Sequence, residues 1–184
     1  MNEVWQIFST HIPFLKFAFN FDIHAFVLMN NHYHLIASTP DWNLSDGMSY
    51  FQREISRELN RQGNRINRNF AGRYFKCNLK NSHHFLNCYK YVYQNPLRAG
   101  IVSRCELYPF SALHEIIGYR RTMIPIFDDQ ILFEPNLDAH LKWLNTLPLE
   151  EDVNSIRLAL KKGVYNLRKN PSTKKPNRLE EGLL

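Results

Sequence analysis

The 184-residue sequence contains few cysteines and no long apolar run, and each absence narrows the possibilities. Its three cysteines, Cys77, Cys88 and Cys105, are odd in number and lack CxxC spacing, so neither a disulfide framework nor a thiolate metal site is indicated. No uninterrupted apolar stretch approaches the length that crosses a bilayer, and no basic-then-apolar leader opens the chain. We therefore expect a cytoplasmic protein with no membrane partner.

Acidic residues are the scarcer charged class. There are 17 Asp and Glu against 23 Lys and Arg, which gives a formal net charge of +6. This balance favours a polyanionic partner without identifying it. Because 44% of the residues are apolar, the chain can bury a full core in one domain, and no second domain is required.

The most informative stretch is IHAFVLMNNHYHLIAS, residues 23–38. Its near-continuous apolar run over 23–29 predicts a strand that is buried on both faces. Asn30 and Asn31 both tolerate positive φ, which predicts a tight turn, and a second strand is then expected to begin at His32. The stretch is therefore predicted to be a β-hairpin.

Two histidines are expected to project from one face of the second strand. Side chains alternate along a strand, so His32 and His34 share a face while the residue between them takes the other. Neutral imidazole is a good ligand, and a strand fixes the distance between the two rings, so the pair could hold one divalent metal ion. The alternative is that both are ordinary polar residues on the solvent face of a hairpin.

Zinc sites and small-molecule metal hydrolases also use a His-X-His pattern. Zinc accepts two histidines, but no third nitrogen or sulfur ligand is apparent in this sequence. Small-molecule metal hydrolases need further His and Asp ligands and usually a much longer chain. Neither class is favoured here.

Helices are expected on both sides of the hairpin. Residues 2–12 carry apolar side chains at helical spacing, and Pro13 is expected to stop or kink that helix. Residues 45–61 repeat the apolar pattern behind Ser45, which can cap the helix. A strand over 73–79 is expected to follow.

Arginines follow one face of the expected 45–61 helix and continue beyond it among asparagines. This composition fits contacts to DNA phosphates that position the protein without reading sequence. A charged stripe is also the ordinary solvated face of a helix, particularly where glutamates lie beside it, as Glu54 and Glu58 do here. The arginines concerned are Arg53, Arg57, Arg61, Arg65, Arg68 and Arg73.

Residues 82–95 are expected to form the next helix. Its apolar members gather on one side, and Tyr91 lies roughly 160° from their centre at 100° per residue, so its phenol is expected to be exposed. Tyr89 and Tyr93 are expected to pack against the core instead. Asn95 lies four residues beyond Tyr91, which would place an amide oxygen one turn beyond the phenol.

Two segments of the chain resemble one known family, the single-tyrosine HUH transposases, and in particular the REP-associated tyrosine transposases and their insertion-sequence relatives. VLMNNHYHLI, residues 27–36, resembles the metal-binding motif of strand, turn and His-X-His. YKYVYQNPLRAGIV, residues 89–102, resembles the nucleophile helix, in which Tyr is followed after three residues by Asn-Pro. The resemblance continues through residues 107–113 and faintly through 154–163, so it covers most of 23–163.

The resemblance implies a fold and a set of site residues. The fold is α+β, an antiparallel sheet of ferredoxin-like HUH type with helices on one face, here without the strand that the family places ahead of its first helix. The missing strand predicts a truncated copy or a late start codon. By position, Tyr91 is the nucleophile, and His32, His34 and Asn95 would hold Mg²⁺ or Mn²⁺, because substrate oxygens favour a hard ion.

The implied activity is metal-dependent transposition of single-stranded DNA. The enzyme would cleave and rejoin hairpin-associated DNA through a 5′-phosphotyrosine intermediate, as a monomer or homodimer associated with the nucleoid. The alternative is a domesticated or truncated copy that binds hairpin DNA but no longer cuts it. The missing strand favours this alternative, and the four intact site residues oppose it.

Beyond residue 102 the sequence is less informative. A short helix is expected within 108–118, a strand within 124–133, and helices over 137–144 and 153–162. The basic, Pro-containing end of the chain is expected to be disordered. The predicted organisation is a catalytic domain at 1–118, a helical extension at 119–168 and a disordered basic tail at 169–184.

Overall fold

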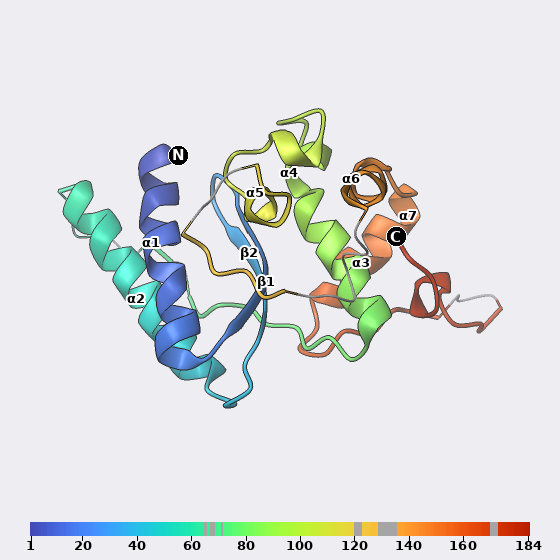
Figure 1. The fold of residues 1–184 in the computed structure, drawn as a ribbon. Coiled ribbons are helices and arrows are strands. Elements are labelled where there is room, and N and C mark those ends of the chain that lie inside the picture. Colours follow the sequence, from blue (N-terminus) through green and yellow to red (C-terminus); the bar gives the residue numbers. More distant parts are fainter. Residues whose placement is uncertain (65, 67–68, 71, 120–122, 129–135, 170–172) are drawn as a thin grey trace. The chain divides into compact units, whose positions relative to one another are not determined.

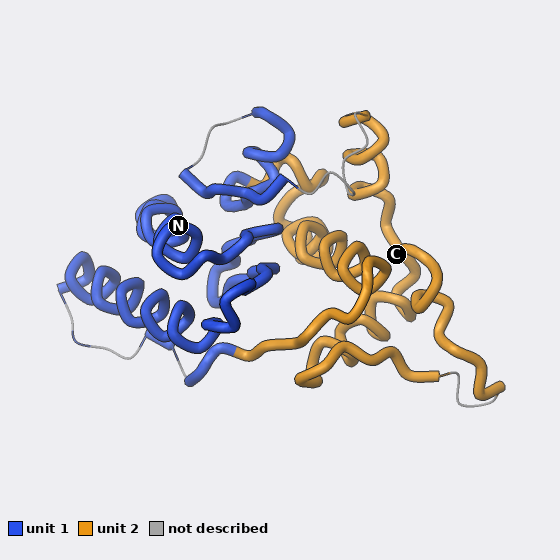
Figure 2. The backbone as a smooth tube through the Cα atoms, turned by 60° about the horizontal axis from the view of Figure 1, so that its bottom comes forward, with its two compact units in different colours: residues 1–74, 109–129 blue, residues 75–108, 130–184 orange. Residues whose placement is uncertain are grey.

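The computed structural model has an α+β architecture. The residues that it describes are 1–64, 66, 69–70, 72–119, 123–128, 136–169 and 173–184. They contain one two-stranded antiparallel sheet and seven α-helices, which confirms the predicted fold class. The chain divides into two compact units, each built from two segments: unit 1 is residues 1–74 and 109–129, and unit 2 is residues 75–108 and 130–184 (Figure 2).

Unit 1 combines the predicted hairpin with two long helices (Figure 1). Helix α1 spans Asn2–Phe19, and the hairpin strands are β1, Asp22–Leu28, and β2, Tyr33–Ser38. Helix α2 spans Leu44–Gln62, and the short helix α5 spans Leu113–Ile116. Among the described residues no strand precedes α1.

The core of unit 1 lies between α1, α2 and one face of the hairpin. Phe8 of α1 stacks on Phe26 of β1, with ring centroids 5.9 Å apart, and meets Phe51 of α2 edge-on at 5.8 Å. Tyr33 and Leu35 of β2 pack against the same cluster. The two helices therefore cover the face opposite to the histidines, as the strand alternation predicts.

Helix α1 is longer than expected. Pro13 was predicted to stop or kink this helix near residue 12. It does not stop the helix, which continues to Phe19. Proline removes one hydrogen bond, but the apolar stripe continues to Leu15, which is fully buried, so packing favours further turns. The helix ends where Asn20 adopts the left-handed conformation, with φ 54°.

The hairpin turn also differs in detail from its prediction. The predicted tight turn forms, but neither Asn30 nor Asn31 uses the positive φ on which that prediction rested. The Met29 N–H donates to the His32 carbonyl at 2.8 Å, and β2 begins at Tyr33, one residue later than expected. Asn30 and Asn31 still reverse the chain, and β1 and β2 pair antiparallel, as predicted.

Helix α2 forms close to its predicted bounds, with Asn43 rather than Ser45 at its N-cap. The helix approaches the start of the hairpin closely at Gly47. A Cβ at this position would lie 2.5 Å from Cζ of Phe21, so glycine is required for this packing.

The second segment of unit 1 runs beside β1. The Leu28 N–H donates to the Phe110 carbonyl at 2.9 Å, and the Phe127 N–H donates to the Ile23 carbonyl at 2.7 Å. The strand expected within 124–133 is reduced here to one bridge at Ile126, and residues 129–133 lie outside the described part of the chain. Unit 1 therefore takes residues on both sides of the predicted boundary at 118, Phe110 before it and Phe127 after it, and its two segments are separated by residues 75–108 of unit 2.

Unit 2 is mainly helical. Its helices are α3, Ser82–Tyr93, α4, Asn95–Arg98, α6, Leu137–Asn145, and α7, Glu150–Leu160. Single 3-10 turns lie at Cys105–Leu107 and Arg178–Glu180. The strand predicted over 73–79 does not form among the described residues, where Asn78 makes a single bridge to Val164. A strand needs a partner that pairs with several successive residues, and a single bridge does not provide one.

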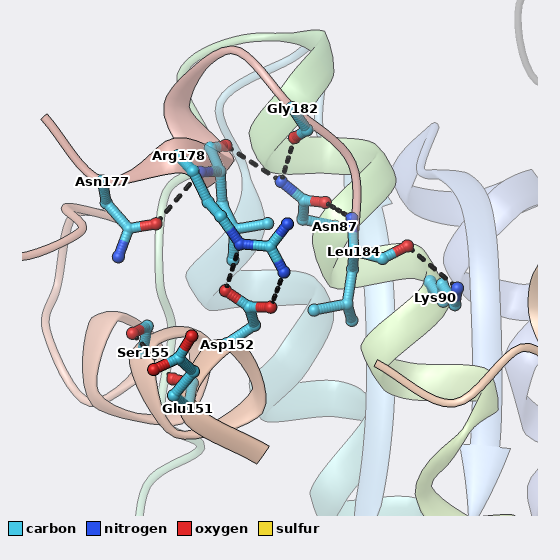
Figure 3. Close-up of polar contacts among 10 residues, drawn as sticks. Asn87, Lys90, Glu151, Asp152, Ser155, Asn177, Arg178, Gly182 and Leu184 are labelled. Atoms are coloured by element: carbon cyan, nitrogen blue, oxygen red, sulfur yellow. Dashed lines mark hydrogen bonds and ion pairs between the residues drawn. The ribbon is translucent and has the colours of Figure 1, made fainter. Parts of the chain in front are cut away.

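The end of the chain is folded, which corrects the predicted disordered tail. Figure 3 shows residues 177–184 against α3, where the Asn87 amide donates to the carbonyls of Leu179 and Gly182 at 3.0 and 3.1 Å. The Leu184 N–H donates back to Asn87 Oδ1 at 2.6 Å. Composition predicted disorder because the segment is polar, but burying Leu179 and Leu184 on a helix that offers matching polar groups stabilises it.

No helix in the described part of the chain is both long and apolar enough to cross a membrane.

Candidate active site

The two histidines converge, as predicted. His32 Nε2 and His34 Nε2 lie 3.2 Å apart, and the two rings are nearly perpendicular, with centroids 4.9 Å apart. Tyr33, between them, packs into the core on the other face. The hairpin therefore presents two imidazole nitrogens to one point.

A neighbouring residue orients the first histidine. His32 Nδ1 lies 2.7 Å from Oδ1 of Asn31, and an N–H at Nδ1 donating to that oxygen leaves the Nε2 lone pair directed at His34. Partial burial lowers the pKa of His32 below its ordinary value, which favours the neutral ring that binds metal. The sequence reasoning missed Asn31, although its position in the turn directly before the histidine was a usable signal.

The pair has the spacing that a metal ion requires. Two nitrogens bound to one ion at right angles, with bonds of about 2.1 Å, lie roughly 3 Å apart. The observed separation of 3.2 Å fits this geometry. Among the described residues, no group of three or more His, Cys, Asp or Glu could hold an ion. The remaining ligands would therefore be amide or substrate oxygens.

Tyr91 lies on α3 but is not exposed, so this part of the prediction is wrong. Only 8% of its surface is accessible, and every residue from Asn87 to Tyr93 is buried. The prediction assumed one apolar face, whereas α3 also buries polar residues such as Lys90. In addition, the Arg98 guanidinium lies over the Tyr91 ring, 4.1 Å from its centroid. Tyr89 and Tyr93 are buried, as predicted.

Asn95 lies one turn beyond Tyr91, although it begins α4 rather than ending α3. Its amide Nδ2 donates to the Tyr91 carbonyl at 2.9 Å. Its Oδ1 accepts from Nη2 of Arg98 at 3.3 Å. Tyr91, Asn95 and Arg98 thus form one connected group, and the sequence reasoning missed Arg98 even though it lies within the NPLR segment.

The comparison with protein families decides the family. The family model described as "Transposase IS200 like" matches residues 2–95, about half of the chain, and this span includes both histidines, Tyr91 and Asn95. The chain belongs to the IS200-like transposases. No curated protein and no solved structure matches it.

Membership makes this protein a transposase whose partner is DNA. The histidine pair of the transposase belongs to unit 1, and Tyr91 and Asn95 belong to unit 2. The meeting of the four residues around one metal ion therefore stays a prediction.

The arginines of the transposase are placed only in part. Arg53, Arg57 and Arg61 follow the exposed side of α2, with 68 to 80% of each side chain accessible. Each lies within 4 Å of a glutamate of the same helix, Glu54 or Glu58, so their charge is partly neutralised. Of the other predicted contacts, Arg73 is exposed, and Arg65 and Arg68 lie outside the described residues.

Proposed function

We propose that this transposase cleaves and rejoins single-stranded, hairpin-associated DNA by metal-dependent chemistry at Tyr91. The observation that carries the proposal is the convergence of His32 and His34 on one point, within the segment that matches the IS200-like family. The sequence resemblance assigns Tyr91 and Asn95 to the nucleophile segment, and the two residues lie one turn apart in the structure, joined by a hydrogen bond. A binding-only protein would need neither arrangement.

His32, His34 and Asn95 would hold Mg²⁺ or Mn²⁺. The histidine spacing fits one ion, and an amide oxygen suits the harder of the divalent metals. When bound, such an ion supplies positive charge that polarises a phosphate oxygen.

The role of Tyr91 follows from its phenol. Its oxygen forms a bond to phosphorus, the bond between phosphorus and the 3′ oxygen breaks, the phenol proton passes to water, and the 3′ oxygen takes up a proton. The product is a 5′-phosphotyrosine with a free 3′-OH. Because the new ester retains the energy of the broken one, the strands can be rejoined without ATP.

The test is the capture of this intermediate. Hairpin DNA with a single-stranded flank, labelled at its 3′ end, is incubated with the protein and Mn²⁺ and then separated under denaturing conditions. The label is placed there because the 3′ segment is the part that stays attached to Tyr91. We expect a labelled protein band that disappears with a chelator and in Tyr91→Phe.

Tyr89→Phe and Tyr93→Phe serve as matched controls, since both rings are buried and belong to the same helix as Tyr91. Both variants are expected to keep forming the adduct. Loss of the adduct in Tyr93→Phe with retention in Tyr91→Phe would identify a different nucleophile. If the unmutated protein forms no adduct with any divalent metal, the protein is the binding-only copy instead.

A further inference from the structure

Arg98 contacts both residues that the proposed chemistry requires in unit 2. Its guanidinium carbon lies 4.1 Å from the centre of the Tyr91 ring. Its Nη2 lies 3.3 Å from the Tyr91 carbonyl oxygen and 3.3 Å from Asn95 Oδ1, donating to both. One side chain therefore touches the aromatic face and the main chain of Tyr91 together with the amide of Asn95.

A structural role alone does not account for an arginine at this place. Nε and Nη1 of Arg98 are buried, and neither has a hydrogen-bond partner within the described residues. Burial lowers the pKa of Arg98, and its interactions with Tyr91 oppose that effect. Buried donors without partners are costly, and an apolar side chain of similar length would fill the space without this cost.

The shape of the guanidinium explains why arginine suits the contact. A planar cation can lie flat on an aromatic ring while its edge donates hydrogen bonds in its own plane. Lysine carries the same charge on a flexible stem and cannot make both contacts at once. The geometry therefore uses the properties that distinguish arginine from lysine.

We propose that Arg98 is a positioning residue for DNA cleavage, which holds the Tyr91 ring and the Asn95 amide as one rigid group. It also places a fixed positive charge beside the phenol as its oxygen bonds to phosphorus. Arg98 itself gains and loses no proton in this step. The inference rests on the proposed function, because it assigns Arg98 a role only where Tyr91 is the nucleophile.

The experiment separates the cleavage rate from DNA binding. Adduct formation is followed in a single turnover at saturating hairpin DNA with Mn²⁺, and the Kd for the same DNA is measured independently. The variants are Arg98→Gln, Arg98→Lys and the control Arg168→Gln, which removes an exposed arginine of the same unit.

Arg98→Gln is expected to slow adduct formation by roughly 10²-fold, the scale of loss that follows from a misplaced reacting group. Arg98→Lys is expected to fall between Arg98→Gln and the unmutated protein, because it keeps the charge without the stacking. The Kd should stay within about threefold in both, since a positioning residue acts on the rate at saturation. Arg168→Gln should behave as the unmutated protein does.

A normal saturating rate in Arg98→Gln would overturn the role of Arg98 and leave the proposed function intact, because the unmutated protein still forms its adduct. If Arg98→Gln does not fold, as judged by circular dichroism, Arg98→Lys decides the question: a normal rate in the folded lysine variant overturns the role. Absence of an adduct in the unmutated protein would remove the proposed function and this inference together.

Discussion

The imidazole of His32 is exposed to solvent, but a hydrogen bond to Asn31 fixes its orientation. Its imidazole lies at the edge of the hairpin, and Asn31 accepts the hydrogen bond that fixes the ring. Exposure means that folding depends little on this side chain, whereas orientation matters to any ion that it binds. Effects on chemistry and on stability can therefore be separated at this position.

His32→Ala is expected to abolish cleavage while hairpin binding stays within a few fold. The free energy of unfolding should change by no more than about 0.5 kcal/mol, as is usual for surface substitutions. Asn31→Ala keeps both imidazoles and should raise the Mn²⁺ concentration for half-maximal cleavage by roughly 10-fold. The measurements are strand cleavage against Mn²⁺ concentration and urea unfolding, and normal cleavage by His32→Ala would show that the metal site is elsewhere.

Lys90 makes the stability of the protein depend on pH. The side chain is buried, donates to the Leu184 carbonyl at 2.9 Å and lies over the Trp143 ring. Burial lowers its pKa to about 8, from an ordinary value of 10.5. Between these values the unfolded chain holds a proton that the folded chain has released, so the contribution of Lys90 to the free energy of unfolding rises with pH.

The prediction is tested by urea unfolding of the unmutated protein and Lys90→Met at several pH values from 7.5 to about 10, across the range set by these two pKa values. Other groups also contribute to the pH dependence in this range. Burial raises the pKa of the Cys88 thiol, for example, whereas it lowers that of Lys90. The difference between the two proteins removes their contribution. That difference should rise in favour of the unmutated protein as the pH increases, and a flat difference would contradict it.

At the scale of the element, α2 has two dissimilar faces. Phe51 and Ile55 are fully buried against the hairpin, while Arg53 and Arg57 project into solvent. The ion pairs with Glu54 are surface pairs, which contribute little to stability. The exposed face is thus available for DNA phosphates, at the cost of displacing a glutamate.

Replacing Arg53 and Arg57 by glutamine should weaken DNA binding about equally for all sequences. The slope of log affinity against log salt should become shallower by roughly 0.7 to 0.9 for each phosphate that the variant no longer neutralises. The control removes the same two charges elsewhere, by Arg157→Gln with Lys161→Gln, and should leave the slope unchanged. An unchanged slope in the α2 variant would identify this face as an ordinary solvated surface.

At the scale of the whole molecule, each unit is assembled from distant parts of the chain. Unit 1 takes residues 109–129 to complete the hydrogen bonding of β1, and unit 2 takes the end of the chain to cover α3. Figure 3 shows the last residues of the chain beside α3, where the carbonyls of Gly182 and Leu184 accept hydrogen bonds from Asn87 and Lys90. The end of the chain is therefore part of the framework that holds α3, the helix that carries Tyr91.

Leu179→Ala should lower the free energy of unfolding by about 2–5 kcal/mol, because it removes a fully buried side chain from this interface with α3. Leu183→Ala is the matched control, since Leu183 lies four residues away and is exposed. It should change stability by no more than about 0.5 kcal/mol. Chemical denaturation measures both, and equal effects would contradict the observed packing of the chain end.

The sequence by itself was sufficient for features that depend on backbone periodicity. Strand alternation placed His32 and His34 on one face, and helical periodicity placed Arg53 and Arg57 away from the core, since both are set by bonded geometry within a few residues. The spacing of Tyr91 and Asn95 by one turn survived even though the helix breaks between them.

Only the tertiary structure decided which faces are covered. Three features depend on segments that are remote in sequence: the burial of Tyr91, the folded end of the chain, and the assembly of each unit from two separate segments. A helical wheel assigns exposure from one apolar face, but α3 buries polar residues such as Asn87 because the returning chain supplies their hydrogen-bond partners. Periodicity within a segment contains no information about such partners, because they are brought close only when the chain folds.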